Sequence, residues 1–152
     1  MQKTGKTLKI GSYELELFAE RTAEGYAALT QDLGEDMSLR IFRTLLPTGE
    51  KKSLDFLRGL GIDPQRITCA GPLSEPDENG EVLFLCAAPL SGTLIKGGDT
   101  KPRQSEEEAG ISMVFVGDER EFSKGALPRF PKQVEMRFVL PLTFDPALFS
   151  DI

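Results

Sequence analysis

Glycine and proline interrupt this chain at short intervals, and this spacing limits the length of the elements that it can form. The chain has 15 glycines and 10 prolines in 152 residues, about 16% against an average near 12%. Breakers that recur every ~10–15 residues favour many short strands over long helices. The sequence therefore predicts a mainly β protein.

Alternation of apolar and polar residues locates the strands. Residues 13–17 alternate apolar with glutamate, and residues 133–140 alternate with Glu135 and Arg137 outward. Pro47 is expected to stop one strand, and Pro89 to break an apolar run into two. Strands are predicted at residues 6–10, 13–17, 26–29, 37–46, 82–88, 90–96, 111–116 and 133–140.

One segment changes period. Leu54, Leu57 and Leu60 recur at helical spacing, and Gly61 suits the left-handed position that follows a helix. The sequence therefore predicts a helix near residues 50–60, followed by a short turn that begins at Asp63.

These elements predict a mainly β (α+β) fold with six to eight short strands and one helix. The candidate architectures are an antiparallel sheet, a sandwich, or an oligonucleotide-binding (OB)-like barrel, whose strand order matches by topology alone. We expect a single domain over residues 1–152, with a mobile loop at 97–110, where one residue in 14 is apolar, and a C-terminal tail at 141–152.

Composition excludes several chemistries. The chain has no histidine, so Ser–His or Cys–His nucleophiles cannot form within it, and two cysteines cannot hold zinc alone. We assign no catalytic residue, metal or cofactor. Without a secretory signal or an apolar run long enough to span a membrane, we predict a cytoplasmic protein, with no membrane partner, in which Cys69 and Cys86 are reduced and buried.

Two acidic segments are candidate metal-binding sites. Within residues 75–80, Glu75, Asp77, Asn79 and Gly80 match positions 1, 3, 5 and 6 of an EF-hand loop if Glu replaces the usual first Asp, but position 12 is Cys86 rather than a carboxylate. Residues 106–108 are three glutamates in a polar loop. We read both stretches as solvated turns, and keep a carboxylate or metal-dependent enzyme as a second alternative function.

A candidate binding face lies on the strand predicted at 37–46. If Leu39 and Ile41 face the core, Arg40 and Phe42 share the outer face, with Arg43 nearby. An exposed aromatic beside arginine stacks on bases and neutralises phosphates in single-strand binders. In the alternative interpretation, Phe42 packs under the helix or under a long loop. Additional basic candidates are Lys96, Lys101 and Arg103.

The C-terminal tail combines apolar and acidic residues. Phe144, Leu148 and Phe149 either dock into a partner or fold back over the parent sheet. The acidic net charge of −6 and the missing catalytic motifs favour a non-catalytic interaction or assembly module that binds a protein partner or itself. The first alternative is an OB-type protein that binds single-stranded nucleic acid.

Overall fold

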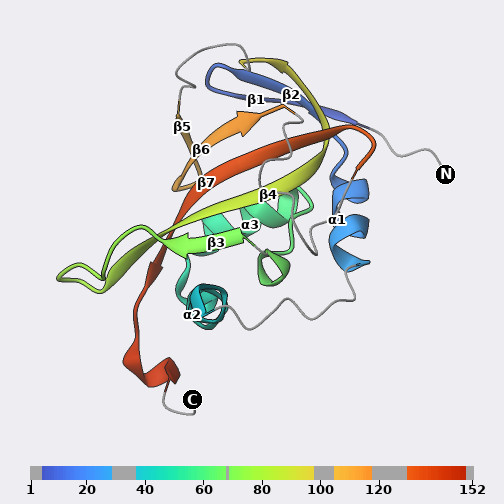
Figure 1. Cartoon of the computed structure of the whole chain (residues 1–152). Coiled ribbons are helices and arrows are strands. Elements are labelled where there is room, and N and C mark those ends of the chain that lie inside the picture. Colours follow the sequence, from blue (N-terminus) through green and yellow to red (C-terminus); the bar gives the residue numbers. More distant parts are fainter. Residues whose placement is uncertain (1–4, 29–36, 68, 98–104, 118–129, 150–152) are drawn as a thin grey trace.

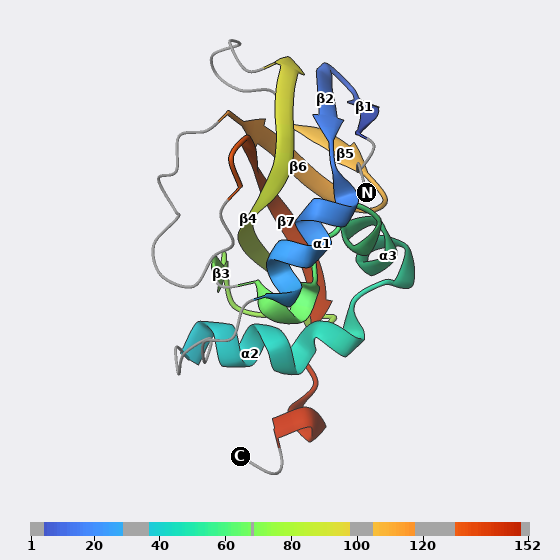
Figure 2. The same ribbon diagram turned by 90° about the vertical axis from the view of Figure 1, so that its right-hand side faces the viewer.

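The computed structural model describes residues 5–28, 37–67, 69–97, 105–117 and 130–149. Within these ranges, seven strands form one antiparallel sheet accompanied by three α-helices (Figures 1 and 2). The strands are β1 Lys6–Ile10, β2 Tyr13–Leu17, β3 Cys69–Pro72, β4 Glu81–Lys96, β5 Glu106–Glu108, β6 Ile111–Val116 and β7 Gln133–Thr143. The helices are α1 Ala19–Ala27, α2 Met37–Leu45 and α3 Lys51–Gly59, with 3₁₀ turns η1 Leu46–Thr48, η2 Pro64–Arg66 and η3 Pro146–Phe149.

The mainly β (α+β) class and the helix near residues 50–60 are confirmed. The expectation of a single helix is wrong, because residues 19–27 and 37–45 are helical as well. In α1, Ala, Glu and Arg favour a helix, and the spacing of four residues puts Thr22 and Tyr26 on its buried face. In α2, the buried residues recur every three positions, at Leu39, Phe42 and Leu45.

The sheet follows the order β1-β2-β4-β7-β6-β5, and β3 pairs with β4 beside this path. The sheet curls strongly, as a contact between β2 and β6 shows. Tyr13 of β2 packs edge-on against Phe115 of β6, with 5.3 Å between the ring centroids, although two strands lie between β2 and β6 in the sheet. The terminal strands also approach each other: Glu106 of β5 accepts two hydrogen bonds from Ser12, in the β1–β2 turn, at 3.1 Å each.

Strand β4 is longer than the sequence predicts, and Pro89 does not break it. β3 pairs with β4 as far as Ala87, and β2 pairs with it from Gly92 onward. Between them, no strand of the described part of the chain pairs with this edge of β4. Pro89 turns its carbonyl toward that edge, where it accepts the Tyr26 hydroxyl at 3.1 Å. Its missing N–H falls on the same edge, so no ladder bond to β7 is lost.

Helix α1 closes this unpaired edge. The Ser91 N–H donates to the Thr22 hydroxyl oxygen at 2.9 Å, and the Ser91 carbonyl accepts from the N–H of Phe18 at 2.9 Å. Buried backbone groups need such partners, so side chains of α1 substitute for a strand along β4.

Two other expectations change. Residues 106–108 pair with β6, so the predicted loop at 97–110 ends in a strand, while its residues 98–104 lie outside the described ranges. Glu135 was predicted to face outward, but it is buried, with 2% of the residue exposed. Its Oε2 accepts a hydrogen bond from Nε of Arg137 at 2.9 Å. Among the described residues, no helix has the length and apolarity needed to cross a membrane.

Candidate binding groove

An apolar groove of about 590 Å³ opens between α2, the β3–β4 connection and the C-terminal segment. Figure 1 shows these three segments at one end of the molecule. Ser74 and Glu75 are the polar residues of the lining. The apolar lining consists of Ile41, Leu45, Pro72, Leu73, Pro76, Val82, Phe84 and Phe144.

The floor of the groove is fixed by the core. Phe42 of α2 is fully buried and its ring lies 5.3 Å from the ring of Phe84, the fully buried groove residue of β4. Ile41 and Leu45, spaced by one helical turn, then flank the groove from α2.

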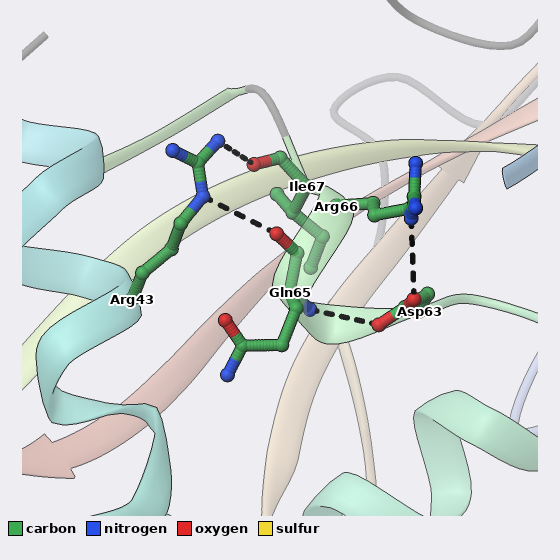
Figure 3. A network of polar contacts seen from close by, with 5 residues as sticks. All are labelled: Arg43, Asp63, Gln65, Arg66 and Ile67. Atoms are coloured by element: carbon green, nitrogen blue, oxygen red, sulfur yellow. Dashed lines mark hydrogen bonds and ion pairs between the residues drawn. The ribbon is translucent and has the colours of Figure 1, made fainter. Parts of the chain in front are cut away.

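Arg43 fastens α2 from its other side (Figure 3). Its guanidinium donates from Nε to the Gln65 carbonyl at 3.2 Å and toward the Ile67 carbonyl at 3.5 Å. The receiving turn is itself capped, since Asp63 accepts from the Gln65 N–H at 3.0 Å and lies 3.6 Å from Arg66. This network sets the position of the helix that flanks the groove.

The β3–β4 connection is a structured turn. Asp77 accepts from the N–H groups of Asn79 and Glu81 at 2.9 and 2.8 Å, and Gly80 adopts a left-handed φ of 82°. Asp77 therefore caps a turn, as the polar-turn reading of residues 75–80 predicts. In the described ranges, no three His, Cys, Asp or Glu side chains are placed to hold a metal ion.

The C-terminal segment forms the remaining wall. The Phe144 N–H donates to the Gly80 carbonyl at 2.7 Å, and the Thr143 N–H donates to the Thr48 hydroxyl oxygen at 2.8 Å. Phe144 and Leu148 are each 40% exposed. The side chain of Phe149 lies outside what the structure describes.

The predicted basic face is not present on α2. The prediction that Phe42 shares an outer face with Arg40 is wrong, because helical spacing turns Phe42 into the core while Arg40 stays exposed. Arg43 is half-buried against the carbonyls of η2 and its following residue. Lys96 is at the end of β4, 3.8 Å from Glu14, and Lys101 and Arg103 lie outside the described ranges.

Buried polar groups lie elsewhere in the fold. Burial raises the pKa of the Tyr26 phenol far above its ordinary value, and the carboxylates of Asp63 and Glu135 add to this effect. Its hydroxyl is committed to the carbonyl of Pro89. Tyr26 therefore acts in packing, not in the groove.

Of the groove residues, Phe144 was predicted from the sequence as a docking residue and the others were not. One local signal was available, because Leu73 is a large apolar residue in an otherwise polar and proline-rich turn, and it is 53% exposed. An exposed apolar patch with polar surroundings marks an interaction surface. No protein-family model, curated protein or solved structure matches the chain.

Proposed function

We propose that this protein is a non-catalytic interaction module that holds an apolar segment of a protein partner in the groove. The observation that supports the proposal is the groove itself, in which Leu73 and Phe144 present exposed apolar surface beside the buried Phe84 and Leu45. The lining is apolar apart from Ser74 and Glu75, and Leu73 and Phe144 leave part of it exposed. Exposed apolar surface that is bordered by polar residues marks an interaction site, so the groove is suited to apolar anchor side chains of a protein partner.

The nucleic-acid alternative has lost its stacking residue, although Arg40 stays exposed. Its stacking residue, Phe42, is buried, and Arg43 is bonded to backbone carbonyls. An exposed aromatic residue remains at Phe144, but Asp145 follows it directly and Glu75 lines the same groove, and these carboxylates repel phosphates.

Site-specific crosslinking tests the proposal. A photoreactive phenylalanine analogue is placed at Leu73 in the full chain, and a control chain carries it at Ile95, which is similarly exposed (51% against 53%) but lies near the far end of β4. Irradiation in the source cells is expected to give a discrete protein adduct from position 73 and not from position 95. Equal adduct patterns, or an adduct of two copies of this chain, would overturn the proposal.

Paired variants show whether the groove supplies the affinity. Leu73→Ser with Phe144→Ser removes two exposed anchors, and Ile95→Ser is the matched control. Against the protein identified by crosslinking, the double variant is expected to bind at least about tenfold more weakly, and the control to bind as wild type does. Circular dichroism confirms that all three chains are folded, so that equal affinities would contradict the assignment.

A further inference from the structure

The groove has an acidic rim, which we define as Glu75, Asp77 and Glu78 of the β3–β4 connection together with Asp145 of the C-terminal segment. All four side chains are exposed. Glu75 also lines the groove, and Asp145 directly follows Phe144. Within the described ranges, none of the four makes an ion pair.

Two of the four rim carboxylates, Glu75 and Glu78, differ from the others in their hydrogen bonding within the described ranges. Asp77 caps its own turn, and Asp145 accepts from the Ala147 N–H at 3.0 Å in η3. Glu75 and Glu78 have no side-chain hydrogen bond or ion pair to a described residue. Neighbouring like charges repel one another and destabilise a turn, so these two glutamates carry a cost that a cationic partner would offset.

Cations on the flanking helix do not balance the rim. Arg40 is exposed on α2 and, among the described residues, makes no ion pair with a rim carboxylate. Arg43 points its guanidinium to the backbone of Gln65 and Ile67, on the side of α2 shown in Figure 3. The groove therefore combines an apolar floor with a net negative edge, and this combination selects the charge of whatever binds.

We infer that the partner segment is basic: bulky apolar side chains that enter the groove, flanked by lysine or arginine that faces the acidic rim. This inference rests on the proposed function and specifies its partner. The same edge disfavours fatty acids, acidic peptides and nucleic acids, whose negative groups would face Glu75 and Asp145. Positive steering toward the rim would also raise the association rate at low salt.

Two synthetic peptides test the inference. The first peptide, of about 14 residues, carries leucine at the helical spacing i, i+3, i+4 and i+7, and every charged residue in it is lysine. The second peptide is identical except that glutamate replaces each lysine. Both carry the same dye, and binding to the full chain is followed by fluorescence anisotropy. The lysine peptide is expected to bind, and to bind more weakly when the salt is raised from about 0.1 M to about 1 M, which shortens the Debye length from about 10 to 3 Å.

Charge-matched variants localise the effect. Glu75→Lys with Glu78→Lys reverses two rim charges, whereas Glu107→Lys with Glu108→Lys reverses two exposed charges on β5, away from α2 (Figure 1). The rim variant is expected to lower the affinity for the lysine peptide about tenfold, and the β5 variant less than about twofold. Equal losses from both variants would mean that net charge alone attracts the peptide, and would overturn the inference.

The remaining outcomes separate this inference from the function on which it rests. If the glutamate peptide binds as tightly as the lysine peptide, or if the rim variant binds the lysine peptide as wild type does, the partner is not basic. The groove stays supported in either case by an adduct at position 73. If no such adduct forms, and Leu73→Ser with Phe144→Ser leaves peptide binding unchanged, the groove itself is not the binding site.

Discussion

Substitution of Thr22 tests whether α1 supplies the hydrogen bonds that the unpaired edge of β4 needs. The Thr22 side chain is fully buried, and its hydroxyl accepts the Ser91 N–H at 2.9 Å while donating to the Phe18 carbonyl at 3.1 Å. Thr22→Val keeps the shape of the side chain and removes both bonds. The Phe18 carbonyl keeps the N–H of Thr22 at 3.0 Å, so the Ser91 N–H is the group left without a partner.

An unsatisfied buried N–H costs about 1–3 kcal/mol. Threonine and valine have similar helix propensities, so the free energy of unfolding should fall by about 2 kcal/mol. For a domain of this size, that fall corresponds to a melting temperature lower by about 4–8 °C. Urea and thermal unfolding followed by far-ultraviolet circular dichroism measure both quantities, and the absence of tryptophan makes this a better probe than fluorescence.

Thr44→Val is the matched control. The Thr44 hydroxyl donates to the Arg40 carbonyl at 2.7 Å, but the residue is half-exposed and its loss leaves no buried backbone group unpaired. Its effect should stay within about 0.5 kcal/mol. If the two variants lose the same stability, or if Thr22→Val loses none, the idea that α1 supplies hydrogen bonds to β4 is refuted.

Further predictions concern Tyr26 and two glycines. Tyr26→Phe should lower the free energy of unfolding by about 1–3 kcal/mol, because it removes the donor to the Pro89 carbonyl. Folding raises the pKa of Tyr26, so the unfolded chain loses the phenol proton at a lower pH than the folded chain does. The free energy of unfolding of the wild type should therefore fall above about pH 10 more steeply than that of the variant, as urea titrations at several pH values would show. Parallel curves would contradict the burial argument. Gly61→Ala should destabilise by about 2 kcal/mol or more, because φ is +93° and the added Cβ would collide with the Ala19 carbonyl oxygen. In Gly59→Ala, the added Cβ at the end of α3 meets open space, so this variant should be neutral or stabilising by up to about 1 kcal/mol. Thermal melts in which both variants behaved alike would argue against strain at Gly61.

The sequence predicted those elements whose periodicity is unambiguous. Residues 51–59 have one apolar stripe and a glycine after it, and residues 13–17 alternate without exception. In α2 the apolar residues fit both periods, because Leu39 and Ile41 are two apart while Leu39 and Phe42 are three apart. Packing against Phe84 decides in favour of the helix, and that contact is not visible in a local pattern.

Other features depend on tertiary arrangement and could not be predicted. Pro89 is tolerated because its missing N–H falls on the edge of β4 that α1 covers. The alternation around Glu135 indicates which residues share a face, but not that this face is buried. The groove joins three distant segments, so only single residues such as Phe144 could be named as candidates.

The central place of β4 also sets the order in which the sheet can be built during synthesis. The β1–β2 hairpin leaves the ribosome early, but its partner residues at 92–96 follow only after all three helices, and Glu106 reaches Ser12 across 94 positions of chain. β7 pairs with both β4 and β6 and is the last strand in the described ranges. Such distant pairings slow folding, so the sheet is completed only after β7, the strand that joins β4 to β6, has been synthesised.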